Sequence, residues 1–380
     1  MEVNQGRGIG AAGGNDRLPA VQELEQLIET WEGLAVLTHF DKPTGTWIFI
    51  CIHDNTLGPS TGGTRIATYA SPADGLLDGM RLSAGMTHKW AAANLGFGGA
   101  KAVLAVPHPM AGDERQGLLS RYAGMINLLS GNFLTGEDMG ITPEDMEFLA
   151  RHTDHLHGYD VNGRKVDPSP YTARGVLTGI KTALERKFGE PSVHGRTVVV
   201  QGAGNVGGHL IRMLTAEGAE VLIADVDRER ARNLASECNA RLIDDRSGAS
   251  GGNGSEVFST ECDVFAPCAV GAILNQETIP RLACPIVAGS ANNQLEEPED
   301  VERLRERGIL WAPDYIVNAG GAISFAYLGK GISEPAELFD KVDSIGTTLA
   351  EIFREAEDRN ESTLAAAERR VARTLERERG

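Results

Sequence analysis

The feature that most constrains this fold is a glycine-rich turn set between a strand pattern and a helix pattern. Residues 202–207 read GAGNVG, directly after the β-branched run at 197–201 and before a helix pattern that starts at Val206. An acid, Asp225, ends the next apolar run, about 20 residues further on. Alone, GxGxxG is a weak signal. In this context it predicts an α/β, doubly wound parallel sheet that binds a dinucleotide.

Each position of the turn has a physical role in this prediction. Gly202 permits the tight bend, Gly204 lets the backbone approach a pyrophosphate, and Gly207 allows the helix to pack closely on the strand. The helix begins around Asn205 and Val206, where free N–H groups and a partial positive charge favour phosphates. The alternative is a glycine turn without a ligand.

The cofactor that this site favours is NAD. Asp225 would accept hydrogen bonds from the adenosine ribose hydroxyls, and its carboxylate would repel the 2′-phosphate of NADP. Arg228 and Arg230 lie nearby and keep NADP open as the alternative.

Length and composition limit the other possibilities. The chain has 380 residues and a net charge of −17, so we expect two domains and no nucleic-acid partner, which would need a basic surface. No apolar run reaches the roughly 18 residues of a membrane span. Residues 1–16 lack the apolar core of a signal peptide, and we expect a flexible leader there and a cytoplasmic protein.

The pattern along the chain predicts a substrate and oligomerisation domain at 17–168 and the dinucleotide domain at 169–332, with C-terminal helices at 333–380 returning to the first domain. The first of these domains shows a helix pattern at 16–32, a strand pattern at 45–54 and a helix pattern at 74–93. The glycine- and proline-rich segment between them, LGPSTGGTR, predicts irregular structure. After residue 169, strands alternate with helices, as in a parallel sheet.

Cysteine and histidine usage does not favour a metal site. The five cysteines are odd in number and lack CxxC spacing, which favours free thiols in a reducing compartment. His152, His155 and His157 share the segment RHTDHLHG, where a metal patch is one interpretation. Cationic side chains near a helix C-terminus are the other, and we expect no metal because no Cys or carboxylate cluster completes the set.

Two lysines stand out because their neighbours are small or apolar. Lys89 lies in GMTHKWAAANLG, and Lys101 lies between a glycine loop and an apolar strand in GFGGAKAVLAV. A lysine is usually solvated at the surface. A buried ammonium close to another ammonium has a lowered pKa and can act as a neutral general base, while its charged neighbour can bind a carboxylate.

A third candidate is Asp138, in the loop FLTGEDMGITPEDM. It precedes a helix pattern that starts at Pro143. The functional interpretation is proton transfer, and the alternative is helix capping or ordinary surface acidity.

Taken together, these segments resemble the Glu/Leu/Phe/Val amino acid dehydrogenases, in particular the leucine, valine and phenylalanine enzymes. The resemblance runs from about Ile48 to the C-terminal helices. It is carried by the segments HDNTLGPSTGGTR, LSAGMTHKWAAANLGFGGAKAVL, TGEDMGITPEDM, VVQGAGNVG, DVFAPCAVGAILN, VAGSANNQL and APDYIVNAGGAI. It implies a two-domain fold, a homo-oligomer, and NAD-dependent reversible oxidative deamination of an apolar L-amino acid to a 2-oxo acid and ammonium.

The resemblance also implies roles for single residues. Lys89 would bind the substrate carboxylate, Lys101 would be the catalytic base, and Asp138 would take part in proton transfer. Further substrate contacts are implied at Gly62, Gly63 and Asn293. Further cofactor contacts are implied at Cys268, Ala269 and Asn318.

The pocket for the substrate side chain falls, by the same resemblance, on Thr61, Gly136, Ala322 and Phe325. Leucine enzymes carry bulkier aliphatic residues at the Thr61 and Ala322 positions and alanine at Gly136, so Gly136 predicts extra space. Phe325 refills part of that space or stacks on an aromatic ring. We therefore expect bulky apolar substrates to react at least as well as leucine, and glutamate to react poorly.

Two other functions remain open. One is a different dehydrogenase with a Lys–Asp pair, such as a shikimate-type enzyme, against which the segments TGGTR, ANNQL and NAGGAI argue. The other is a non-catalytic NAD-binding regulator of the same fold, against which the presence of Lys89, Lys101 and Asp138 argues.

Overall fold

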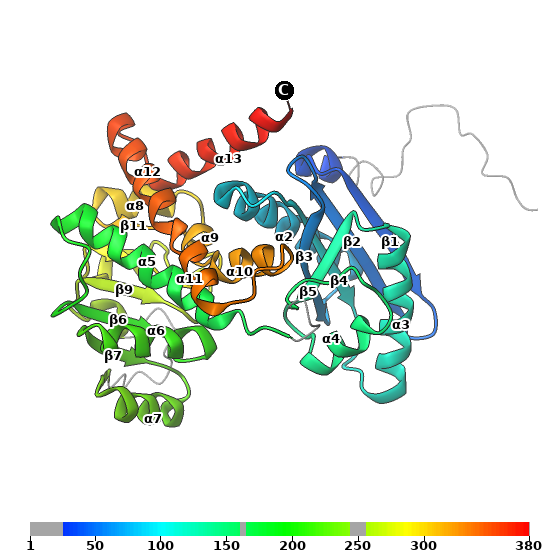
Figure 1. Cartoon of the computed structure of the whole chain (residues 1–380), viewed down its shortest axis with the longest axis horizontal. Coiled ribbons are helices and arrows are strands. Elements are labelled where there is room, and N and C mark those ends of the chain that lie inside the picture. Colours follow the sequence, from blue (N-terminus) through cyan, green and yellow to red (C-terminus); the bar gives the residue numbers. More distant parts are fainter. Residues whose placement is uncertain (1–25, 160–164, 244–255, 380) are drawn as a thin grey trace, which may run out of the picture.

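The computed structural model describes residues 26–159, 165–243 and 256–379. The predicted leader, 1–16, lies outside these residues. Two β-sheets form two lobes, with helices α2 (Pro72–Ala93) and α10 (Gly320–Leu328) between them (Figure 1). This is the two-domain α/β architecture that the sequence predicts.

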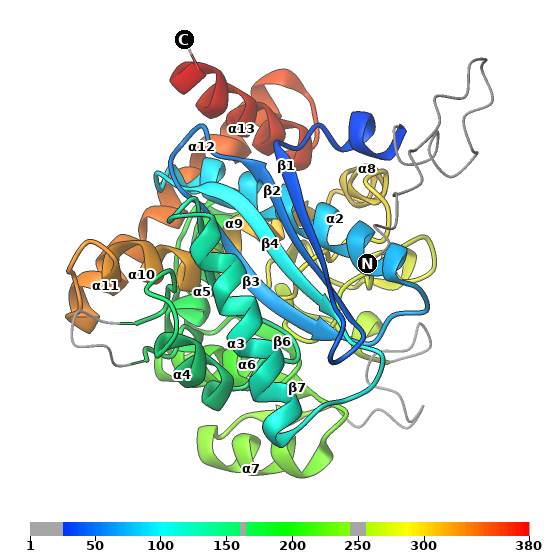
Figure 2. The ribbon, with the colours of Figure 1, turned by 90° about the vertical axis from the view of Figure 1, so that its right-hand side faces the viewer.

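The first sheet has five strands in the order β1-β2-β4-β3-β5. Strand β2 pairs antiparallel with β1 and β4, whereas β3 runs parallel to both β4 and β5. Helix α2 packs on one face, and α3 covers the other, as Figure 2 shows. The elements are β1 (Ala35–Asp41), β2 (Thr46–Asp54), β3 (Ser60–Ala67), β4 (Gly98–Ala105), α3 (Gly112–Leu128), β5 (Phe133–Glu137) and α4 (Pro143–Ala150).

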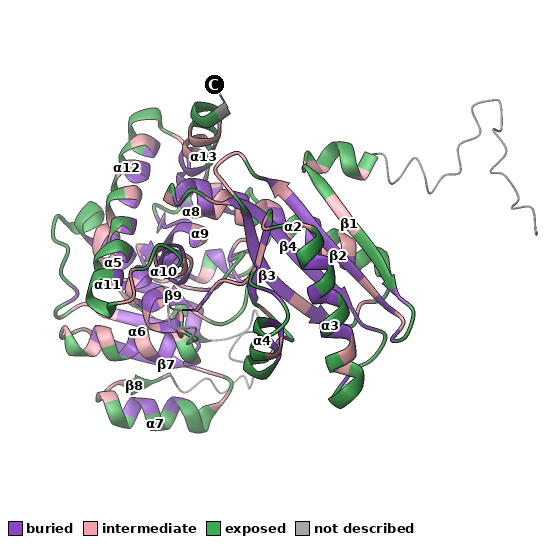
Figure 3. Cartoon of the chain, turned by 45° about the vertical axis from the view of Figure 1, so that its right-hand side comes forward, coloured by how far each residue is buried: buried purple, intermediate pink, exposed green. Residues whose placement is uncertain are grey.

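The prediction of irregular structure for LGPSTGGTR is wrong, because most of this segment belongs to strand β3. The strand lies between β4 and β5, and its glycines are required by this crowding. A Cβ at Gly62 would lie 1.7 Å from the carbonyl oxygen of Ala100, and one at Gly63 would lie 2.7 Å from that of Glu137. Strand β1 was not predicted; it is an edge strand and largely exposed (Figure 3).

The second sheet has six strands in the order β11-β10-β9-β6-β7-β8, and every pair in it is parallel. The prediction of a doubly wound parallel sheet is therefore confirmed. Its elements are α5 (Ser169–Phe188), β6 (Thr197–Gln201), α6 (Asn205–Ala216), β7 (Glu220–Ala224), α7 (Arg228–Cys238), β8 (Arg241–Leu242), η1 (Glu256–Ser259), β9 (Val264–Pro267), η2 (Ile279–Arg281), β10 (Ile286–Val287), α8 (Asp300–Glu306), β11 (Leu310–Trp311) and α9 (Asp314–Val317).

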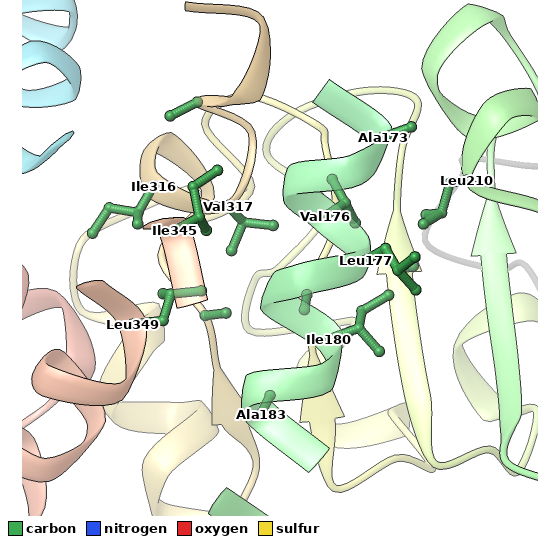
Figure 4. Close-up of a cluster of buried hydrophobic side chains, with 14 of the residues drawn as sticks. Ala173, Val176, Leu177, Ile180, Ala183, Leu210, Ile316, Val317, Ile345 and Leu349 are labelled. Carbon is green, nitrogen blue, oxygen red and sulfur yellow. The ribbon is translucent and has the colours of Figure 1, made fainter. Parts of the chain in front are cut away.

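Helix α5 organises the largest hydrophobic core. Its buried side chains Val176, Leu177 and Ile180 pack between α6 on one side and the later helices on the other (Figure 4). Gly179 allows this contact to be close, since a Cβ there would lie 3.2 Å from the Leu349 side chain. The same core reaches Trp90 at the end of α2, so it joins the two lobes.

The chain ends in α11 (Pro335–Val342), α12 (Ser344–Arg359) and α13 (Thr363–Arg379). The break predicted near Asn360 is present, where this residue takes a left-handed conformation with a φ of 52°. Helices α11 and α12 pack on α5, and α13 packs on α2, where the Arg370 side chain donates to the carbonyl oxygen of Ala92. The domain boundaries 17–168, 169–332 and 333–380 stay predictions. Among the described residues, none of the helices combines the length and the apolar character needed to cross a bilayer.

The core around α5 gives a stability prediction. Leu349 is fully buried, so Leu349→Ala should lower the free energy of unfolding by about 2–5 kcal/mol, through lost burial and the cavity left behind. Urea unfolding followed by circular dichroism measures this. Leu128→Ala is the control, because Leu128 is 76% exposed and its loss should change stability by less than about 0.5 kcal/mol. Equal midpoints for the two variants would contradict the role given to this core.

Candidate active site

An ion pair between Lys101 and Asp138 lies at the centre of the site. Lys101 is on β4 opposite Cys51 of β2, and this register places its side chain on the α2 face of the first sheet. Asp138 follows β5 directly. The Lys101 Nζ lies 2.8 Å from the Asp138 Oδ2, and the lysine side chain is only 7% exposed.

A second cation holds the same carboxylate. Arg65, on β3 between the other two strands, donates from its Nε to the Asp138 Oδ2 at 3.0 Å. Its Nη1 donates to the Oδ2 of Asp78 on α2 at 2.8 Å, and Tyr69 donates to that oxygen as well. Asp138 is thus fixed from two strands, which argues for an oriented carboxylate and against the surface alternative.

Burial and neighbouring charges shift the pKa of both Lys101 and Asp138. Burial lowers the pKa of Lys101, and the Asp138 charge compensates only in part. Burial raises the pKa of Asp138, but Lys101 and Arg65 outweigh this effect, so the pKa lies below its ordinary value. The lysine is therefore nearer to the neutral form that a general base needs, while the aspartate stays ionised.

Lys89 lies on the last turns of α2 and is half-buried. Its neighbour Trp90 donates from the indole nitrogen to the carbonyl oxygen of Thr61, which fixes this end of the helix against β3. Burial lowers the pKa of Lys89 to about 8, with the positive charge of Lys101 adding to this effect and the negative charge of Asp314 opposing it. Lys89 and Lys101 therefore act on each other, as two ammonium groups in one site do.

Asp314, which sequence reasoning missed, connects Lys89 to the second lobe. It is buried at the start of α9, and its Oδ2 accepts the backbone N–H of Gln294 at 2.8 Å. The adjacent Asn293 is exposed, with a φ of 51° and its carbonyl oxygen bonded to the N–H of Ala272. Helix α9, to which the ANNQ segment is bonded, thus packs against the lysine helix α2 here.

The glycine turn has the form that a dinucleotide requires. Gly202 has a φ of +101°, and a Cβ at Gly207 would lie 1.9 Å from the Gly202 carbonyl oxygen. At Gly204 a Cβ would meet nothing nearer than the Arg230 guanidinium at 3.9 Å, so the turn is open to a phosphate. Helix α6 begins at Asn205 with no side-chain cap among the described residues.

Three other predicted cofactor residues, Asp225, Cys268 and Ala269, lie beside the glycine turn. Asp225 accepts the N–H of Ala203 at 2.5 Å, which fixes its carboxylate beside the turn. Cys268 and Ala269 follow β9 and border Gly202.

Asn318 ends α9, and its amide donates to the Asn292 side chain at 2.7 Å. Its oxygen is buried and has no hydrogen-bond partner in the described part of the chain. A buried acceptor of this kind suits the carboxamide N–H of a nicotinamide, so the residues present fit the cofactor.

Thr61 is buried, and its hydroxyl donates to the carbonyl oxygen of Leu134 at 3.0 Å. The polar group of Thr61 is therefore satisfied by a hydrogen bond to the neighbouring strand β5. Ala322 and Phe325 lie about one turn apart on α10 and are half-buried.

The extra space expected at Gly136 is absent, because the ring of His157 fills it. A Cβ at Gly136 would lie 2.2 Å from the His157 Cε1. The same ring lies 5.3 Å from that of Phe325, centroid to centroid. The prediction that Gly136 enlarges the pocket is therefore wrong.

Comparison with known proteins agrees with this geometry. The sequence model described as Glu/Leu/Phe/Val dehydrogenase, dimerisation domain, matches residues 42–155. The model described as Glutamate/Leucine/Phenylalanine/Valine dehydrogenase matches residues 166–355.

The chain belongs to this dehydrogenase family. It is 38% identical to leucine dehydrogenase of Geobacillus stearothermophilus over 93% of this chain and 94% of that protein. It is 39% identical to L-tryptophan dehydrogenase of Nostoc punctiforme over 84% of this chain and 87% of that protein. The crystal structure of the Nostoc punctiforme enzyme superimposes on this chain with a TM-score of 0.80, and the superposition covers 93% of this chain and 99% of that one.

In this member of the dehydrogenase family, Lys101 and Asp138 pair on the α2 face of the first sheet, and the charges of both act on Lys89 of α2. Sequence reasoning missed three further residues of this site, Arg65, Asp78 and Asp314, and it considered His157 only as part of a metal patch. Arg65 and Asp314 lie in the segments TGGTR and APDYIVN, which carried the family resemblance, and a charged residue within each of these segments was the available signal. Among the described residues, no group of three or more His, Cys, Asp or Glu side chains is arranged to hold a metal ion.

The pKa of Lys89 gives a pH prediction. Lys89 is protonated below about pH 8 and can bind a carboxylate only in that form. The dissociation constant of a 2-oxo acid, which carries no amine of its own, should therefore rise as the pH increases from 7 to 9.5, by about tenfold per unit above the pKa. Isothermal titration with NADH present measures it. Lys89→Met should bind weakly and lose this dependence, whereas a constant affinity in the unmodified chain would contradict the assignment.

Proposed function

We propose that this chain catalyses the NAD-dependent, reversible oxidative deamination of an apolar or aromatic L-amino acid to its 2-oxo acid and ammonium. The observation that carries the proposal is the buried Lys101–Asp138 pair, with Lys89 on the adjacent helix facing α9 of the dinucleotide lobe. Family membership supports the reaction type. The relatives named for leucine and tryptophan, together with a 37% identical phenylalanine dehydrogenase of Lysinibacillus sphaericus, support the substrate class.

The side chains divide the work in this proposal. Charged Lys89 binds the substrate carboxylate and orients Cα. A bound NAD, held at the glycine turn Gly202–Gly207 with Asp225, would supply the acceptor for the hydride of Cα, and the oxidised substrate would then be an imine. Lys101, in its neutral form, takes a proton from water as the water attacks the imine carbon. Asp138 moves protons to and from the nitrogen, and the carbinolamine collapses to the 2-oxo acid and ammonium.

The cofactor preference is part of the proposal. Asp225 is held beside the glycine turn by the Ala203 and Asp227 N–H groups, where it keeps lone pairs free for ribose hydroxyls. Arg230 is paired with Asp227 at 2.8 Å, which reduces its availability for a 2′-phosphate. Both observations support NAD over NADP.

Assembly and location are proposed on less direct grounds. We propose a homo-oligomer, supported by the match of residues 42–155 to a domain described as a dimerisation domain and by the exposed edge strand β1. The cytoplasmic location stays a prediction. Membership of the family disfavours a shikimate-type enzyme, and the ordered Lys–Asp pair disfavours a regulator without activity.

The direct test is to follow NADH absorbance with the purified chain, NAD and a panel of L-amino acids. We expect turnover with leucine, phenylalanine or tryptophan and little with glutamate. No turnover with any member of the panel would refute the proposed function.

Lys101→Ala tests the assignment of the base. Turnover should fall by about 10²–10⁴-fold, because the general base is lost, while NAD binding measured by fluorescence persists. Lys42→Ala, which removes an exposed lysine, is the matched control and should keep full activity. Near-normal turnover of Lys101→Ala would show that another group activates the water.

Asp225→Asn tests the cofactor preference. The unmodified chain should have a higher kcat/KM with NAD than with NADP. The variant keeps an acceptor for the Ala203 N–H but loses the negative charge, so the NAD-to-NADP ratio should fall by about tenfold or more. An unchanged ratio, or a preference of the unmodified chain for NADP, would overturn the role of Asp225.

A further inference from the structure

The most informative unexplained group in the molecule is the imidazole of His157. Both of its ring nitrogens are buried, and neither has a hydrogen-bond partner among the described residues. Buried polar atoms are nearly always paired, so an unpaired imidazole beside the lysine site points to a partner that is bound from outside.

The ring lies on the reacting side of the first sheet. On β5, Thr135 faces the opposite side, where its hydroxyl contacts that of Thr64. Because side chains alternate along a strand, the adjacent Gly136 faces the α2 side, as Lys101 does. The His157 ring covers Gly136, and the charge of Lys101 acts on it.

An aromatic ring lies on another side of the imidazole. The Phe325 ring lies 5.3 Å away at an interplanar angle of 45°, and it also packs against Gly158. Burial, with a contribution from Lys101, lowers the pKa of His157 to about 4. The imidazole is therefore neutral at physiological pH and offers one N–H donor and one nitrogen acceptor.

We propose that His157 forms a hydrogen bond with the side chain of the substrate, so that the preferred substrates are aromatic L-amino acids whose ring carries an N–H or O–H group, an indole or a phenol. The Phe325 ring selects for the aromatic system, and the imidazole selects for its polar hydrogen. An aliphatic or plain phenyl side chain would leave the buried imidazole unpaired. This inference rests on the proposed function.

Gly136 contributes to the position of the His157 ring. No side chain larger than hydrogen fits under the His157 ring, because a Cβ would lie 2.2–2.7 Å from three of its atoms. Glycine at this position therefore keeps the imidazole in place rather than enlarging the pocket.

The test compares kcat/KM for L-tryptophan, L-tyrosine, L-phenylalanine and L-leucine. In the unmodified chain, tryptophan or tyrosine should exceed phenylalanine. In His157→Phe, which keeps a ring but loses both nitrogens, that ratio should fall by about tenfold or more. His157→Gln, which restores a donor and an acceptor, should recover part of it. His108→Phe, at an exposed histidine outside the site, is the matched control.

The outcomes separate the inference from the function on which it rests. No turnover with any of the four amino acids refutes the proposed function. Turnover with a ratio that His157→Phe leaves unchanged refutes the inference alone. If His157→Phe does not fold, as judged by loss of NAD binding, Gly136→Ala displaces the ring from the other side and should lower the same ratio; an unchanged ratio there overturns the proposal.

Discussion

The burial of the Lys101 amine against the Asp138 carboxylate is the interaction on which the site depends. A buried charge is costly unless it is paired, and here the pair requires three strands to lie side by side. Strand β4 supplies the lysine, β5 leads into the aspartate, and β3 between them supplies Arg65. The glycines of β3 let these strands approach closely, so the chemistry and the packing of this sheet arise from the same residues.

The helix α2 connects this pair to the second lobe. Its middle packs on the first sheet through Met80, while its end, from Trp90 onward, enters the large core that α5 organises. Lys89 lies at that junction, within the field of Asp314 from the other lobe. A substrate carboxylate bound there would lie between the lysine pair and the strand ends of the dinucleotide sheet, which is where ligands of such sheets bind.

The sequence predicted the features that consecutive residues form, and it failed where residues far apart in the chain come together. The dinucleotide turn was predictable because strand, glycines and helix are consecutive, and every residue needed for the argument lies between residues 197 and 225. Strand β3 was not predictable, because its glycines are typical of a loop, and the need for them arises only from the packing of β4 and β5 on either side. The pocket was misjudged for the same reason: the residue that fills the space at Gly136 is His157, about twenty positions away, and only the folded chain brings the two together. The lysine pair lies between these cases. Its apolar neighbours predicted that both lysines are buried, but they did not predict the Asp314 carboxylate near Lys89 or Arg65, which shares Asp138 with Lys101.

The central claim is that Lys101 is a desolvated amine whose ammonium form is retained mainly by Asp138. Selective 13C labelling of the few lysine side chains, with the Lys101 signal assigned from Lys101→Arg, would follow its titration directly by NMR. The account predicts a midpoint below the ordinary value of 10.5 in the unmodified chain. It predicts a still lower midpoint in Asp138→Asn, because removing the carboxylate removes the charge that favours the protonated lysine. A midpoint at or above 10.5, or one that does not move in Asp138→Asn, would contradict it.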